Sequence, residues 1–267
     1  MNDDDFSAAR RALGEARRQA RRIDDLPAAW LPGDLAEAYR LQQAVTADLG
    51  NIRGWKVTAI TAAQQAALHL AGPIAAPMLA PWWHDASTAP ARLHRRDFIA
   101  PLLECEFAFV LGRDLPARRS PYTRDEVGQA VEALCLGIEI ADSRLPRGLG
   151  VHAELADAFN HGAFIAGPLQ RDWQDIDFAS TQIELSFGGD AGERTLATGS
   201  GRAILDGDPF GAVVLLANVG VGADTGRGLR AGDIVTTGSC SGAPALPGPG
   251  KCVAVFGALG RVEFEFD

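Results

Sequence analysis

Lysine is scarce in this chain, although basic residues as a class are not. Of the 25 lysines and arginines, only Lys56 and Lys251 are lysines. Acidic residues outnumber basic ones by 34 to 25, which gives a formal net charge of −9, and the arginines are scattered or confined to the first predicted helix. The sequence therefore predicts no basic face for nucleic acid. Each lysine becomes a candidate for a specific role.

Long apolar runs and a basic leader are also missing. No run approaches the ~18 consecutive apolar residues that a membrane helix needs, and the start MNDDDFSAARRALG has acids where a signal peptide carries positive charge. The cysteines show no CxxC spacing, so we expect reduced, mostly buried thiols. They are Cys105, Cys135, Cys240 and Cys252. A cytoplasmic globular protein without a membrane partner is predicted.

Helix signals dominate the start of the chain and strand signals its second half. Apolar periodicity predicts helices over residues 6–23 and 35–49, the second capped by Asp34 and ended by Gly50. A strand over residues 53–60 and a short helix after Thr61 follow, and Pro73–Pro90 reads as a connecting region. The remaining expected elements are strands over 102–112 and from 137, helices over 123–135 and 209–218, an extended stretch at 163–167, a hairpin at 181–199, and strands over 231–239 and 250–266.

Few of these strands alternate with helices, so parallel βαβ units are not expected. We predict an α+β fold, a mixed β-roll or sandwich with a helical N-terminal part. The predicted division places a helical subdomain at residues 1–80 and a catalytic β-roll domain at residues 81–267.

The stretch LLECEFAFVLG, residues 102–112, reads as a buried strand that carries two glutamates. Because side chains alternate along a strand, Glu104 and Glu106 point to the same face, with backbones ~7 Å apart. Two buried carboxylates repel each other, and a cation between them resolves the conflict. A third lone acid, Glu139, lies between isoleucines in GIEIADS. Three carboxylates without paired His or Cys favour Mg²⁺ or Mn²⁺ over zinc, although a Glu-x-Glu pair alone is more often a solvated strand face.

Six segments carry a specific resemblance. GWKV, LLECEFAFVLGRDLP, YTRDEV, GIEIADSR, LRAGDIVTTGSCSG and FGALGRVEFEF occur in this order in the chain. In order and spacing the chain resembles the 2-keto-4-pentenoate hydratase family, which is related to the C-terminal domain of fumarylacetoacetate hydrolase. The resemblance covers nearly the whole chain after residue 30. It implies a metal-dependent lyase with a mixed β-roll fold.

The resemblance also implies roles for particular residues. Glu104, Glu106 and Glu139 match the family's metal ligands, and Lys56 matches a lysine of its active site. Burial would lower the pKa of Lys56 while the anionic surroundings oppose that shift. The loop Thr237–Ser239 matches a segment that contacts the substrate carboxylate, and Asn160 stands at a position that is usually a small hydroxyl residue. We expect a small-molecule 2-oxo or enol acid as substrate and a homo-oligomer, or an association with a paralogous subunit.

Two departures from the hydratase pattern keep alternatives open. Ala76 and Pro77 precede Met78 where hydratases carry an acid thought to position water, and Asn160 changes a second position. A decarboxylase of the 4-oxalocrotonate type uses the same chelate, and a catalytically silent paralogue is another possibility. An acylpyruvate-type carbon–carbon hydrolase needs a His–Glu pair upstream of Glu104, but no histidine precedes His69.

Three other patterns carry little weight. The sequence GSCSG at residues 238–242 has the form of a nucleophile elbow, but the prolines that follow forbid the helix it needs, so Cys240 is not expected to be a nucleophile. GVGADTG at residues 220–226 lacks the spacing of a dinucleotide fingerprint. His161 could act as a base, although a lone histidine is more often structural.

Overall fold

The computed structural model describes residues 1–190, 192–221 and 227–267. Ala191, in the predicted 181–199 hairpin, and most of the glycine-containing stretch 220–226 lie outside the described residues. Within the described part of the chain, no helix combines the length and the apolar character needed to cross a bilayer.

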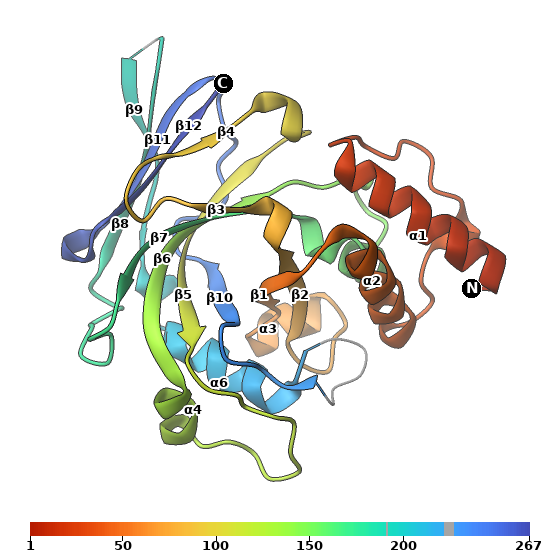
Figure 1. Ribbon diagram of the computed structural model, residues 1–267, viewed down its shortest axis with the longest axis horizontal. Coiled ribbons are helices and arrows are strands. Elements are labelled where there is room, and N and C mark those ends of the chain that lie inside the picture. Colours follow the sequence, from red (N-terminus) through yellow and green to blue (C-terminus); the bar gives the residue numbers. More distant parts are fainter. Residues whose placement is uncertain (191, 222–226) are drawn as a thin grey trace.

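Two β-sheets form the body of the molecule (Figure 1). The larger has seven strands in the order β2-β1-β10-β5-β6-β7-β3, and the smaller has five in the order β4-β12-β11-β8-β9. The first sheet consists of β1 (Ile52–Thr58), β2 (Ile74–Leu79), β3 (Trp83–Asp85), β5 (Leu102–Leu111), β6 (Val131–Ala141), β7 (His161–Gln170) and β10 (Ile234–Ser239). The second consists of β4 (Ala91–Leu93), β8 (Gln182–Gly189), β9 (Gly192–Ser200), β11 (Gly250–Phe256) and β12 (Arg261–Phe266).

Alternation along β5 decides what each face of the large sheet does. Leu103, Cys105, Phe107 and Phe109 are all fully buried in the main hydrophobic cluster. That cluster includes residues from the second sheet, and Phe107 packs edge-on against Phe256 of β11. The opposite face of β5 carries the two glutamates. The predicted α+β fold with a mixed sheet is therefore confirmed.

Helices cover the margins of the sheets. Capping begins α2 (Leu35–Leu49) at Asp34, whose side chain accepts from the Glu37 amide, as predicted. Asp208 caps α6 (Pro209–Val219) in the same way. In Figure 1, α1 and α2 lie together at one side of the molecule, while α4 and α6 lie below the large sheet. The other helices are α1 (Asp3–Arg18), α3 (Ala62–Ala67), α4 (Arg124–Ala130) and α5 (Val151–Ala156).

Three element predictions were wrong in extent or kind. The helix expected over residues 6–23 spans Asp3–Arg18. The helix expected to reach Cys135 ends at Ala130, because residues 131–135 begin β6 and pair with β5. The connecting region Pro73–Pro90 contains β2 and β3. Its small and proline residues mask a fully buried strand that pairs antiparallel with β1. The large sheet thus draws strands from both sides of residue 80, and the division at residues 1–80 and 81–267 stays a prediction.

Candidate active site

Strand pairing brings the three predicted acids together. Glu104 of β5 and Glu139 of β6 are direct cross-strand partners, and Glu106 stands opposite Gly137. One carboxylate oxygen from each glutamate lies within 4.8 Å of the others. Glu106 and Glu139 are buried, whereas Glu104 is half-buried. The three acids therefore form one cluster that a hard divalent cation fits.

The oxygens of Glu139 have different surroundings. Oε1 accepts a hydrogen bond from Lys56 Nζ at 2.6 Å and lies 3.2 Å from His161 Nδ1. Oε2 is buried and has no partner among the described residues. A buried carboxylate oxygen without a partner is costly, and a metal ion bound to Glu139 Oε2 would remove that cost. The buried orphan oxygen agrees with the donor set in favouring a cation.

Lys56 on β1 is the central cation of this cluster. Nζ also donates to the Phe159 carbonyl at 3.2 Å. Since an ammonium group has three donors, one N–H remains available beyond these two bonds. Burial is the largest single effect and lowers the pKa of Lys56, but the charges of the three glutamates and the hydrogen bond to Glu139 together raise it more, so the net shift is upward. The anionic surroundings prevail over burial, and the lysine stays protonated.

The pKa values of the carboxyl groups shift in opposite directions. Burial raises the pKa of Glu106 well above its usual value, and the charges of Glu139 and Glu104 add to this. Burial would also raise the pKa of Glu139, but Lys56 and His161 lower it to about 2. The Gly238 amide donates to Glu106 Oε2 at 2.8 Å. Glu139 is thus the resident anion of the cluster.

A pocket of about 1020 Å³ opens over the cluster. Lys56, Glu104 and Glu106 line it, as do Asn160 and residues 237–239. His161 does not line it. This histidine is fully buried, and burial lowers its pKa to about 4. His161 therefore supports Glu139 from behind rather than facing the pocket as a base.

Asn160 lies on an unusual turn. Ala158, Phe159 and Asn160 all have positive φ, between 47° and 62°, which is disfavoured for residues with a Cβ. The turn carries the Phe159 carbonyl to Lys56, and the Asn160 carbonyl accepts from the Asp142 amide. Asn160 Oδ1 is buried without a described partner. Substrate binding by Asn160 remains a prediction. The structure places Asn160 in the lining of the pocket.

The two predicted hydroxyl residues bind the protein itself. Thr237 Oγ1 donates to the Phe107 carbonyl at 2.9 Å, and Ser239 Oγ donates to the Gly242 carbonyl at 2.5 Å. Both line the pocket. Their backbones hold Gly238 against Glu106, so this loop shapes the cluster even without its hydroxyls.

Several neighbouring residues were not singled out from the sequence as supports. Arg144 is buried and forms an ion pair with Asp157, with Nε 2.9 Å from Oδ1. It also donates to the His161 carbonyl, while the Asp142 carboxylate accepts from the Ile99 and Ala100 amides. The Arg144 guanidinium therefore pairs with the carboxylate of Asp157 and not with that of Asp142, its nearer neighbour in the sequence. Sequence proximity favoured Asp142, whereas the turn after α5 brings Asp157 closer.

Fold and site together define a class of protein. Three strand carboxylates and a buried lysine meet under one small-molecule pocket, on a two-sheet α+β framework. No protein-family model matches the chain. Comparison with individual relatives nevertheless shows to which family the chain belongs.

The 2-keto-4-pentenoate hydratase of Paraburkholderia phymatum is 31% identical over 276 residues, covering 100% of this chain and 99% of that protein. The 2-keto-4-pentenoate hydratase 2 of Dechloromonas aromatica is 34% identical over 169 residues, 63% of this chain and 61% of that one, so this match spans about three fifths of the relative. The 4-oxalocrotonate decarboxylase of Pseudomonas putida G7, complexed with magnesium and adipate, superposes with a TM-score of 0.84 at 20% identity, covering 100% and 99%. The chain belongs to the 2-keto-4-pentenoate hydratase family.

Proposed function

We propose that the protein is a Mg²⁺- or Mn²⁺-dependent hydro-lyase that adds water to 2-hydroxypenta-2,4-dienoate or a related dienoic acid. The observation that carries this is the cluster of Glu104, Glu106 and Glu139 beside a protonated Lys56 in one pocket. The names of the relatives support the same reaction. The magnesium in the decarboxylase structure supports the choice of cation.

The three glutamates would hold the cation. When bound, it would supply positive charge that favours a negative 2-oxygen on a chelating 2-oxo acid. Glu139 would turn Oε2 toward it, since Lys56 and His161 already bind Oε1. Glu139 would thus use one carboxylate oxygen for the cation and the other for its contacts with Lys56 and His161.

Lys56 would act as a hydrogen-bond donor to the substrate and as a fixed positive charge. Its free N–H would donate to the substrate, and its raised pKa keeps it ammonium rather than amine. In the first stage the 2-hydroxyl loses its proton and C5 gains one, which gives a 2-oxo-3-enoate. Water then adds across the conjugated bond, hydroxyl at C4 and proton at C3, and the product is a 4-hydroxy-2-oxo acid.

One observation favours decarboxylation as a second candidate. Ala76, fully buried on β2, is the register partner of Lys56, so no carboxylate stands at that position to orient a water. A decarboxylase needs charge stabilisation but no added water. Release of CO₂ from 2-oxohex-3-enedioate without hydration would select this alternative.

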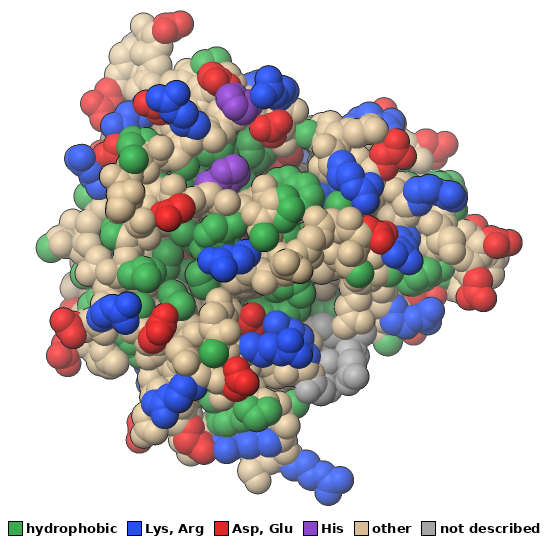
Figure 2. All heavy atoms as spheres, in the orientation of Figure 1, with side chains coloured by type: hydrophobic (Ala, Val, Ile, Leu, Met, Phe, Trp, Pro, Cys, Tyr) green, Lys and Arg blue, Asp and Glu red, His purple; other side chains and the backbone are tan. Residues whose placement is uncertain are grey.

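The proposal also includes where the enzyme acts and how it assembles. Mixed charges without one basic patch, on the face drawn in Figure 2, suit a small-molecule enzyme in the cytoplasm rather than a nucleic-acid partner. We propose a homo-oligomer, or an assembly with a paralogous subunit. Size-exclusion chromatography with light scattering tests the first of these.

The test of function is turnover of 2-hydroxypenta-2,4-dienoate with Mg²⁺, followed as loss of the dienol absorbance. Native protein should form 4-hydroxy-2-oxopentanoate, and Glu106→Gln should not. The hydrolase alternative predicts instead the cleavage of an acylpyruvate. Bound Mg²⁺ without turnover of any of these substrates would contradict the proposal and favour a catalytically silent paralogue.

A further inference from the structure

The pocket over the carboxylate cluster has cationic groups at a second place. Its basic lining side chains are Arg22, Lys56, Arg95 and Arg147. Lys56 is paired with Glu139, and Arg95 donates to two backbone carbonyls. Within residues 1–190, 192–221 and 227–267, Arg22 and Arg147 have no side-chain hydrogen bond or ion pair, and Arg22 Nε is buried. Arg22 is half-buried and Arg147 is exposed, so both guanidinium groups are available to a ligand in the pocket.

The scaffold ties together the two segments that carry these arginines. Arg22 follows α1, and Arg147 follows β6. The Ile23 amide donates to the Arg144 carbonyl at 2.8 Å, which ties the two segments together. Arg144 is fixed in turn by its buried ion pair with Asp157. The backbone around both guanidinium groups is therefore anchored.

The nearby acids of the pocket, Asp142 and Glu154, form no ion pair with either arginine. The carboxylate of Asp142 accepts from two backbone amides. Burial raises the pKa of Glu154, and no arginine acts to lower it. Neither arginine thus has an anionic side-chain partner among the described residues.

Apolar side chains line another part of the pocket. Ile60, Leu145 and Pro146 contribute, and the last two directly precede Arg147 in the chain. The pocket therefore combines a carboxylate cluster, apolar side chains and two guanidinium groups that are unpaired in the described part of the chain. A five-carbon monoacid has no group for the last of these.

We propose that Arg22 and Arg147 bind a second, terminal carboxylate, so that the substrate is a 2-oxo or 2-hydroxydienoic acid with carboxylates at both ends. This rests on the proposed function, because the cluster must hold the 2-oxo acid end. Guanidinium groups match carboxylates with paired, charge-assisted hydrogen bonds. Such a ligand would also give buried Arg22 Nε a partner.

The test compares two non-reacting probes by isothermal titration calorimetry of the full chain with Mg²⁺. 2-Oxoadipate and 2-oxohexanoate share the chelating end and the chain length, but only the first has a terminal carboxylate. We expect native protein to bind 2-oxoadipate about tenfold or more tightly. Arg22→Gln and Arg147→Gln should each reduce that preference, and the double variant should abolish it. Arg21→Gln makes the same charge change one residue away, outside the pocket, and should leave the preference intact.

Oxalate serves as the probe of the chelating end alone and of correct folding. Unchanged oxalate binding in the arginine variants, with the preference lost, supports the inference. Equal binding of both long probes by native protein, or a preference that survives in the double variant, overturns it while oxalate binding leaves the metal site standing. Absence of Mg²⁺-dependent binding of all three probes overturns the proposed function and this inference together.

Discussion

The Lys56–Glu139 ion pair joins two side chains that are both almost removed from solvent. Lys56→Met leaves Glu139 buried without its cation, and breaking such a pair costs about 3–5 kcal/mol. We expect this loss in urea unfolding without Mg²⁺, and a smaller one with saturating Mg²⁺, because the ion supplies positive charge at the cluster.

The other lysine provides the control. Lys251 pairs with Glu263 on the surface, where exposed pairs contribute up to about 1 kcal/mol. Lys251→Met should therefore change the free energy of unfolding little, with or without Mg²⁺. Equal losses for the two lysine variants would contradict a special role for Lys56.

His161 makes the stability of the metal-free protein depend on pH. Burial lowers its pKa to about 4, against about 6.5 when unfolded. Between these values the unfolded chain binds a proton that the folded chain does not, so His161 reduces stability as the pH falls through that window and not above it. His161→Asn should flatten the fall in free energy of unfolding from about pH 7 to about pH 4.5.

Urea titrations across that pH series measure the effect. His152→Asn on α5, a half-buried side chain away from Glu139, is the matched control. Parallel curves for native protein and His161→Asn would show that the ring does not stay neutral in the fold.

For single residues, the sequence predicted the positions of side chains better than the direction of their pKa shifts. Alternation alone placed Glu104 and Glu106 on one face, which the register confirms. The cross-strand pairing of Glu104 with Glu139 depends on strand register, and the upward pKa shift of Lys56 depends on how many anions surround it. Neither the strand register nor the number of surrounding anions can be predicted from the residues next to Glu104 or Lys56 in the sequence.

Strand β9 approaches the segment after β10 very closely. A Cβ on Gly199 would lie 1.8 Å from the Cys240 carbonyl oxygen, so Gly199→Ala must displace backbone. We expect a loss of about 1–3 kcal/mol in urea unfolding. Weaker Mg²⁺ binding should accompany it, since Gly238 in the same loop donates to Glu106.

Gly188→Ala on β8 is the matched control, because its Cβ would come no closer than 4.0 Å to a neighbour outside its own segment. Normal Mg²⁺ affinity in Gly199→Ala would contradict the link between β9 and the carboxylate cluster.

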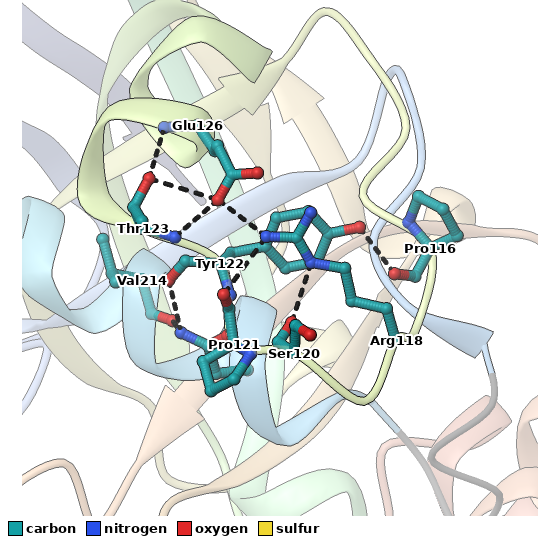
Figure 3. Close-up of polar contacts among 9 residues, drawn as sticks. Pro116, Arg118, Ser120, Pro121, Tyr122, Thr123, Glu126 and Val214 are labelled. Atoms are coloured by element: carbon teal, nitrogen blue, oxygen red, sulfur yellow. Dashed lines mark hydrogen bonds and ion pairs between the residues drawn. The ribbon is translucent and has the colours of Figure 1, made fainter.

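Helix α4 begins in a network that Figure 3 shows. Thr123 Oγ1 accepts from the Glu126 amide, and Glu126 Oε2 accepts from the Thr123 amide and from Arg118. Hydrogen bonding by Arg118, with the Thr123 amide, lowers the pKa of Glu126 to about 2. Thr123→Ala should cost about 1 kcal/mol in thermal or urea unfolding. Thr123→Ser retains the hydroxyl and should recover most of that loss, whereas equal losses would assign the effect to the methyl group.

Sequence predicted where elements begin better than where they end. The cap at Asp34 and the helix starts near residues 123 and 209 depend on local sequence and were all predicted. The end of α4 at Ala130 is set by pairing of residues 131–135 with β5, and β2 is set by its pairing with β1. Tertiary pairing overrides propensity at these places.

For the whole molecule, the cluster links metal binding to stability. A ligand that binds only the folded state at about 100 times its Kd adds about 2.7 kcal/mol. Mg²⁺ should therefore raise the thermal midpoint, and Glu106→Gln should remove this rise. Glu154→Gln changes an acid that lines the same pocket but lies outside the cluster. This variant should retain the rise in the thermal midpoint with Mg²⁺. A rise that persists in Glu106→Gln, at matched ionic strength, would place the ion elsewhere.

The ammonium group beside Glu139 also fixes the order in which the molecule is assembled. Small zinc modules acquire their shape only around the ion, because nothing else offsets their ligands. Here the chain brings its own countercharge, so the freshly made polypeptide can reach its native shape first and load its cation afterwards. Under the proposed function, supply of the ion would then govern when activity begins, not whether the chain folds.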